Sequence, residues 1–86
     1  MPLEQLERLR AAKRRSVGVN QTLKALGKGQ VEMVFVAKDA EEHVLRELRA
    51  RCQEKQIEMV TVDSMSVLGK ACGIEVGAAA AAVLRG

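Results

Sequence analysis

Apolar residues recur along this chain with two different spacings, and segments of the two kinds alternate. Four segments carry apolar residues three or four positions apart, which is typical of helices with one buried face. They span residues 3–12, 20–27, 41–55 and 65–72. Residues 31–38 are a nearly continuous apolar run, which indicates a central strand covered on both faces, and residues 57–62 predict a second strand. The alternation of strands and helices predicts an α/β fold.

Short polar residues and a glycine mark the ends of the helical segments. Asn20 is expected to cap the second helix, because its side chain can accept from the free N–H groups of the first turn. Asp39 is expected to open the third helix as the first residue of a capping box. Asp63 or Ser64 is expected to cap the fourth helix, and Gly73 to end it.

The third and fourth helices have predicted core positions and predicted ion pairs. The core positions are Val44, Leu45, Leu48 and Cys52 in the third helix, and Met65, Leu68, Ala71 and Cys72 in the fourth. The i, i+4 spacing on the outer face of the third helix predicts two ion pairs. They are Glu42 with Arg46 and Glu47 with Arg51. His43 is expected to be a surface residue.

Local and global patterns disagree at residues 78–84. Five consecutive alanines, at positions 78–82, favour a helix by intrinsic propensity. The preceding units alternate strand and helix, however, and a strand here would complete the sheet. The local pattern therefore predicts a helix, whereas the wider pattern predicts a strand.

Length and charge narrow the class of protein. The 86 residues predict one domain, residues 1–86, with a single core. The amino terminus does not have the pattern of a signal peptide and no apolar run reaches membrane-spanning length, so the cytoplasm is the expected compartment. Residues 1–30 carry seven Lys and Arg against two Glu. This local excess favours nucleic acid over a membrane as partner, although a solvated basic surface would have the same pattern.

The sequence offers little for catalysis or for metal binding. His43 is the only histidine, and no phosphate-binding loop, metal-ligand cluster or nucleophile–base pair can be identified. Cys52 and Cys72 lie at apolar positions without a CxxC motif, so two buried reduced thiols are expected, with a disulfide left open. We therefore expect a non-enzymatic protein without a cofactor or a metal.

One helix face combines residue types that suit nucleic acid. Asn20, Gln21, Lys24 and Lys28 fall on one side of the second helix. The opposite side carries the apolar residues Val19, Leu23 and Leu26. Amide side chains both donate and accept, and the lysines are cations, so this stripe matches an anionic groove rich in base edges. The alternative is an ordinary solvated helix face.

Three segments together resemble a known family. They are GVNQTLKAL at residues 18–26, VAKD at residues 36–39 and LGKACGIEVGAAA at residues 68–80. The chain resembles the kink-turn RNA-binding ribosomal proteins, which include the archaeal large-subunit protein "seven-Ae" and the eukaryotic "thirty-e", and it is most similar to the short bacterial members. The similarity covers residues 4–84. Two positions depart from the family pattern: Gln21 replaces a common acidic residue, and Val17 a common Lys or Arg.

The resemblance implies a three-layer α/β/α sandwich with a four-stranded mixed sheet, in which the alanine run is an interior strand. It also implies a ligand: RNA with a kink-turn, meaning tandem sheared G·A pairs beside a bulge. Asn20, Gln21 and Lys24 would face the guanines and nearby phosphates, with Gly18 allowing close approach. The loop Ile74-Glu75-Val76-Gly77 would cover an extruded base, with Ile74 and Val76 as apolar candidates or as core residues. Phosphate contacts would come from Lys13, Arg14, Arg15 and Lys28.

The basic run at residues 13–15 has a second interpretation: these cations stabilise the carboxyl end of the first helix, because the helix macrodipole is negative there. The leading functional hypothesis is a non-enzymatic module that stabilises kink-turns in ribosomal or other structured RNA and is monomeric without RNA. The alternative is a protein–protein interaction domain on the same fold.

Overall fold

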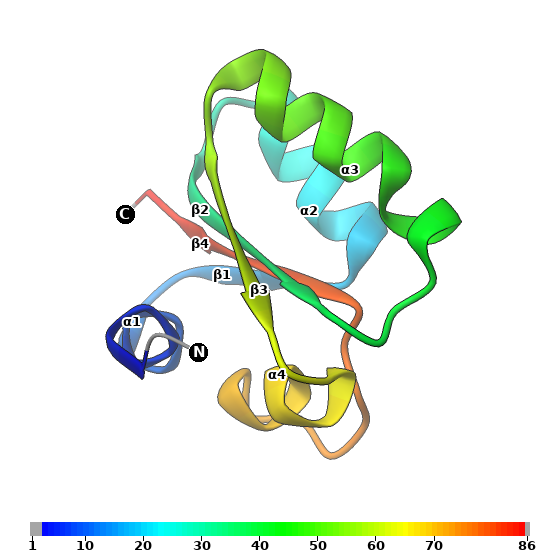
Figure 1. The fold of residues 1–86 in the computed structure, drawn as a ribbon. Coiled ribbons are helices and arrows are strands. Elements are labelled where there is room, and N and C mark those ends of the chain that lie inside the picture. Colours follow the sequence, from blue (N-terminus) through cyan, green and yellow to red (C-terminus); the bar gives the residue numbers. More distant parts are fainter. Residues whose placement is uncertain (1–2, 86) are drawn as a thin grey trace.

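The computed structural model describes the backbone of residues 3–85 and the side chains of residues 5–85. Within this range, helices and strands follow one another along the chain as Figure 1 labels them. The helices are α1 (Leu3–Ala11), α2 (Val19–Gly27), α3 (Glu42–Lys55) and α4 (Met65–Ala71). The strands are β1 (Arg15–Val17), β2 (Val31–Ala37), β3 (Glu58–Val62) and β4 (Ala80–Leu84).

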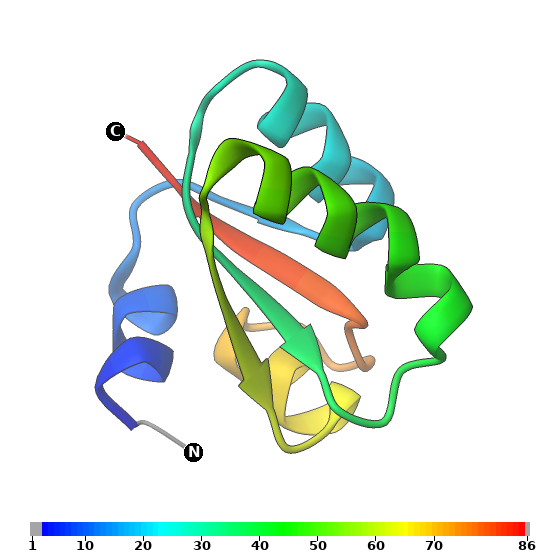
Figure 2. The same ribbon diagram turned by 45° about the horizontal axis from the view of Figure 1, so that its top comes forward.

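The strands form a four-stranded mixed sheet in the order β1-β4-β2-β3. β2 and β3 are parallel, whereas β4 is antiparallel to both β1 and β2. Figures 1 and 2 show α2 and α3 on one face of the sheet and α1 and α4 on the other. The expected three-layer α/β/α sandwich with a mixed sheet is therefore confirmed. No helix within residues 3–85 is long and apolar enough to span a membrane.

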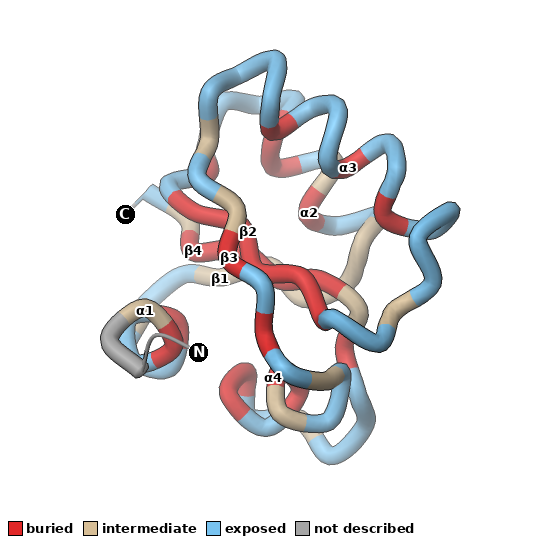
Figure 3. Tube along the Cα trace, viewed as in Figure 1, coloured by how far each residue is buried: buried red, intermediate tan, exposed pale blue. Residues whose placement is uncertain are grey.

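β2 is the central strand that the continuous apolar run predicts. Met33 and Phe35 belong to the cluster under α1 and α4, whereas Val34 and Val36 belong to the cluster under α2 and α3. This alternation follows from the period of two along a strand. Both faces of β2 are covered, and Figure 3 shows the buried residues concentrated in the sheet. An uninterrupted apolar run is therefore stable here without a polar face.

The alanine run forms β4, so the helix favoured by local propensity is wrong. β4 lies between β1 and β2, and the two strands offer backbone partners that an isolated short helix would lack. Ala80 and Ala82 face the α2–α3 side, while Ala81 and Val83 face the α1–α4 side. The small side chains let both helical layers pack close to the sheet.

Two predicted caps are wrong, and one is confirmed. Asn20 lies inside the first turn of α2, because Gly18 is the N-cap residue. Asp39 does not cap α3; its Oδ1 accepts from the backbone N–H of Met65 at 2.8 Å, at the start of α4. Ser64 caps α4 as expected, since its Oγ accepts from the N–H of Val67 at 3.1 Å. Asp39 therefore hydrogen-bonds to the start of α4 and not to the start of α3, the helix that follows it in the sequence.

Most predicted core positions in α3 and α4 are buried, but two are exposed. Val44 is 39% exposed and Met65 is 36% exposed. The buried positions are Leu45, Leu48, Cys52, Leu68, Ala71 and Cys72. Val44 and Met65 both lie in the first turns of their helices.

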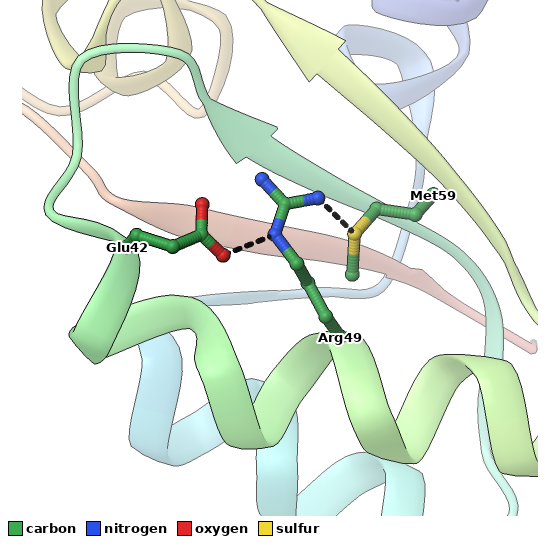
Figure 4. Close-up of polar contacts among 3 residues, drawn as sticks. All are labelled: Glu42, Arg49 and Met59. Atoms are coloured by element: carbon green, nitrogen blue, oxygen red, sulfur yellow. Dashed lines mark hydrogen bonds and ion pairs between the residues drawn. The ribbon is translucent and has the colours of Figure 1, made fainter.

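The outer face of α3 keeps one of its two predicted ion pairs. Arg51 Nη2 lies 3.6 Å from Glu47 Oε2, as expected. Glu42 does not pair with Arg46; its Oε2 accepts from Arg49 Nε at 2.7 Å (Figure 4). Arg49 Nη1 also lies 3.6 Å from the Sδ atom of Met59 on β3. Packing of the Arg49 side chain toward β3 explains this choice of partner. His43 is exposed, as expected.

Cys52 and Cys72 lie on opposite faces of the sheet, Cys52 in α3 and Cys72 at the carboxyl end of α4. Both are buried free thiols, and a disulfide between the two layers would require the sheet to be disrupted. Burial raises the pKa of both thiols, and for Cys72 the Arg15 guanidinium offsets part of that rise.

We expect both thiols to react slowly with iodoacetamide in the folded protein at mildly alkaline pH. The raised pKa reduces the fraction of reactive thiolate, and burial blocks access. Addition of urea should bring both reactions to the rate of a free peptide thiol. Mass spectrometry of each cysteine peptide measures this, and equal rates with and without urea would contradict the burial of that thiol.

Candidate nucleic-acid interface

The start of α2 is held by a turn at Gly18. Gly18 has φ 97°, a backbone conformation that favours glycine. Its N–H donates to the carbonyl oxygen of Ala80 at 2.7 Å. Its own carbonyl oxygen accepts from the N–H of Thr22 at 3.1 Å and from Thr22 Oγ1 at 2.8 Å. The bond to Ala80 fixes the amino end of α2 to the first residue of β4, and the bonds from Thr22 close the first turn of α2.

Thr22 is a residue that the sequence pattern did not single out. It is completely buried, and its hydroxyl lies 3.1 Å from the hydroxyl of Ser16 on β1. Buried hydroxyl groups in proteins are nearly always hydrogen-bonded. The Thr22 hydroxyl has two partners, the Gly18 carbonyl oxygen and the Ser16 hydroxyl. Its position on the apolar side of the helix, four residues after Gly18, is the feature of the sequence that could have indicated its burial. Thr22 therefore ties α2 to both Gly18 and the edge strand.

The polar stripe of α2 is exposed as predicted. Asn20, Gln21, Lys24 and Lys28 are all exposed. The opposite side of the helix carries the buried Thr22, Ala25 and Leu26 and the partly buried Val19 and Leu23. Among the described side chains, none caps the first turn of α2. The backbone N–H groups of that turn and the helix dipole therefore favour a negative charge at this end.

A hollow of about 340 Å³ lies between α2 and the edge strand β1. Its lining is Arg15, Ser16, Val17, Gln21, Lys24, Ala25, Lys28, Gln30 and Leu84. Within the described part of the chain, this lining contains three cationic residues and no carboxylate. The hollow is open to solvent, and its chemistry suits an extended anion rather than an enclosed small molecule.

The loop after α4 is packed tightly against that helix. Gly73, with φ 78°, ends α4 as predicted, and Ile74 N–H donates to the carbonyl oxygen of Gly69 at 3.0 Å. Ala78 N–H donates to the carbonyl oxygen of Met65 at 3.0 Å. A Cβ atom at Gly69 would collide with the carbonyl oxygen of Val76. Gly69, to which the sequence pattern gives no role, therefore sets how closely the loop approaches α4.

The structure separates the two apolar candidates in the loop. Val76 is 70% exposed, whereas Ile74 is partly buried and packs against the α1–α4 core cluster. Glu75 and Gly77 are exposed. A Cβ atom at Gly77 would lie 3.0 Å from Met65 Cβ, so this glycine also allows close packing. Val76 is thus the side chain of this loop that offers apolar surface to a ligand.

The three cations of the basic run have different environments. Arg15 is half-buried, and its Nη1 donates to the carbonyl oxygens of Leu9 and Arg10 at 3.1 and 3.2 Å. These are carbonyls at the end of α1, so the interaction with the helix carboxyl end is confirmed for Arg15. Arg14 Nη1 donates to the carbonyl oxygen of Arg85 at 3.2 Å, and Lys13 is exposed.

The fold brings the two motif regions together. The loop at residues 74–79 leads directly into β4, whose first residue is bonded to Gly18. Figure 1 shows this loop passing into β4 beside the start of α2. Asn20 and Gln21 therefore follow Gly18 directly in the chain, and Val76 lies four residues before Ala80, the partner of Gly18. Lys24 and Lys28 continue the surface along α2 toward the start of β1.

Comparisons with known proteins agree with this architecture. Residues 3–86 match the model of the ribosomal protein L7Ae/L30e/S12e/Gadd45 family. An RNA-binding protein of Caldanaerobacter subterraneus is 52% identical over 69 residues, which cover 80% of this chain and 84% of that protein. The RNA-binding protein YbxF of Geobacillus stearothermophilus is 45% identical over 69 residues, with the same coverage.

Solved structures are also similar. The Giardia lamblia 15.5kD RNA binding protein superposes with a TM-score of 0.87 at 28% identity, covering 98% of this chain and 73% of that one. A Bacillus halodurans protein of unknown function superposes with a TM-score of 0.79 at 30% identity, covering 94% of this chain and 81% of that one.

Proposed function

Because this chain belongs to the ribosomal protein L7Ae/L30e/S12e/Gadd45 family, we propose that it is a non-enzymatic RNA-binding protein that recognises and stabilises kink-turns. The relatives named as RNA-binding proteins support RNA binding. Kink-turn recognition is supported by the Gly18–Ala80 hydrogen bond, which holds the start of α2 against the start of β4, the strand that the loop at residues 74–79 enters.

The chemistry of the two regions suits an irregular RNA. The major groove of regular A-form RNA is too deep and narrow for side chains to read. A kink-turn opens the helix at its sheared G·A pairs, where Asn20 and Gln21 can donate to and accept from base edges. Lys24 neutralises nearby phosphates, and Gly18 leaves room for the RNA to approach the backbone.

The exposed valine of the loop has a separate role in this proposal. Val76 covers the face of a base that is turned out from the bulge. Aromatic stacking is not available at this position, since the single aromatic residue of the chain, Phe35, is buried in β2. Apolar contact with an aliphatic side chain replaces it. Ile74 supports the loop from the core side.

The proposal extends to the compartment, the oligomeric state and the target RNA. We propose a protein of the cytoplasm that is monomeric without RNA and binds kink-turns in ribosomal or other structured RNA. Its role is to hold the bent form of the RNA, because binding only the bent state shifts the population toward it.

A gel-shift titration at several salt concentrations tests the proposal. The protein should bind a kink-turn RNA more tightly than the same RNA with its G·A pairs replaced by Watson–Crick pairs. Equal affinity for both RNAs would contradict kink-turn recognition. A failure to bind either RNA, together with a protein partner that remains bound after nuclease treatment, would favour the protein-interaction alternative.

Lys28→Ala is expected to weaken binding to every RNA by a similar factor. Lys28 is exposed at the end of α2 and contacts phosphate, which carries no sequence information. The slope of log affinity against log salt should fall by about one. Titrations at several salt concentrations measure this, and Arg46→Ala, which removes a cation from the outer face of α3, serves as the control. A loss confined to the kink-turn RNA would contradict the phosphate role.

A further inference from the structure

A second basic surface lies beyond the end of α2, where β1 begins and β4 ends. Lys13 and Arg14 lie between α1 and β1, and Arg85 follows β4. All three residues are exposed. None of them forms an ion pair with a carboxylate of the described residues. We call Lys13, Arg14 and Arg85 the basic end.

Hydrogen bonds hold the segments of the basic end together. Arg14 Nη1 donates to the carbonyl oxygen of Arg85 at 3.2 Å, and Leu84 N–H donates to the carbonyl oxygen of Arg14 at 3.0 Å. Arg85 N–H donates to the carbonyl oxygen of Gln30 at 2.7 Å. Figure 2 shows the end of β4 beside the segment that connects α1 to β1. The fold therefore places cations from both ends of the sequence at one edge of the sheet.

The charges at this edge are not balanced within the described molecule. Glu32 lines a hollow with Lys13 and Arg14, but its carboxylate lies 3.9 Å from Arg8. The carboxyl end of α1 does not account for the cations either, because Arg15 already bonds to its carbonyls. Like charges gathered without counter-charges repel one another, and a polyanion relieves that repulsion.

The basic end adjoins the proposed RNA surface. The hollow beside α2 is lined by Lys28 and Leu84, and the hollow beside α1 is lined by Lys13, Arg14 and Leu84, so the two meet at Leu84. α2 has nine residues and is about 13 Å long. An RNA arm that follows α2 from Asn20 past Lys28 therefore arrives at the basic end.

We infer that the basic end binds the phosphates of a duplex arm that extends beyond the kink, so that the preferred ligand is a kink-turn with one long arm. This inference rests on the proposed function and specifies the RNA that it takes. The contacts are electrostatic and carry no base readout. Affinity should therefore depend on the length of one arm, independently of the G·A pairs.

The experiment uses three RNAs: a kink-turn with two short arms, and two versions in which one arm or the other is longer by about one helical turn. The wild-type protein should bind one of the long-armed RNAs roughly tenfold more tightly than the short RNA at low salt, with a salt slope steeper by about two. The double variant Lys13→Ala/Arg85→Ala, which keeps one of the three cations, should lose most of this preference. Arg14 is retained because its guanidinium holds the backbone of Arg85.

The control is the double variant Lys38→Ala/Arg46→Ala, which removes two exposed cations from other parts of the surface. It should keep the preference for the long arm. Equal wild-type affinity for all three RNAs would overturn the inference, as would an undiminished preference in Lys13→Ala/Arg85→Ala. If the short kink-turn were bound no better than a plain duplex, the proposed function would fail instead. A thermal melt of each variant verifies that it folds.

Discussion

Replacing Asn20 with alanine is expected to reduce the free energy of binding to kink-turn RNA by about 1–3 kcal/mol, the range for one good amide-to-base contact. Asn20 is exposed in the first turn of α2 and is not the helix cap, so its side chain is available for a ligand. The loss should be confined to RNA with intact G·A pairs. Binding to the RNA with replaced pairs should change little, so the variant loses discrimination.

The folded state should be nearly unaffected by this substitution. An exposed side chain that makes no cap is usually worth less than about 0.5 kcal/mol to stability. Gln53→Ala is the matched control, because it removes an exposed amide from α3. Gel shifts measure the binding and urea titration measures the stability. Equal losses on intact and replaced RNAs would show that Asn20 does not read the G·A pairs.

Replacing Gly69 with alanine is expected to destabilise the protein by about 1–3 kcal/mol and to weaken kink-turn binding as well. The added Cβ atom would meet the backbone carbonyl of Val76, which cannot rotate away as a flexible side chain would. The loop must therefore move away from α4 and carry the exposed Val76 with it. Gly69 is itself buried and contacts no RNA in the proposal, so any effect on binding acts through the loop.

Gly27→Ala provides the comparison for this variant. A Cβ atom at Gly27 would have no described heavy atom within 4 Å outside its immediate neighbours. Alanine there should leave RNA binding unchanged and leave stability unchanged or improved, since it favours helix. Urea titration and gel shifts of both variants measure the effects. Wild-type stability and affinity in Gly69→Ala would contradict the tight packing of the loop.

The alanine run shows where local rules fail and why. Intrinsic propensity acts on each residue separately, and for alanine it favours a helix. The strand is selected by backbone hydrogen bonds to β1 and β2, which are distant in the sequence. The resemblance to a known family predicted this strand correctly because the family pattern already reflects those distant partners. Asp39 is a second example, since its partner is the backbone of Met65.

Some features of the candidate site could be predicted from the sequence, and others could not. The spacing of Asn20, Gln21, Lys24 and Lys28 placed them on one exposed helix face, because a helix has a fixed period. The sequence alone did not show which carbonyl groups Arg15 bonds at the end of α1, that Ile74 packs into the core or that Val76 is exposed. Nor did it select Thr22 or Gly69, whose importance depends on atoms of other segments.

By itself, then, the sequence determined the alternation of helices and strands, the two-sided burial of β2 and the exposed stripe of α2. Each of these follows from periods of two or 3.6 residues that operate within a single segment. The tertiary structure alone decided the partner of Asp39, the close packing of the 74–79 loop on α4 and the gathering of Lys13, Arg14 and Arg85 at one edge. Those features depend on contacts between segments far apart in the chain, and no local period encodes such contacts.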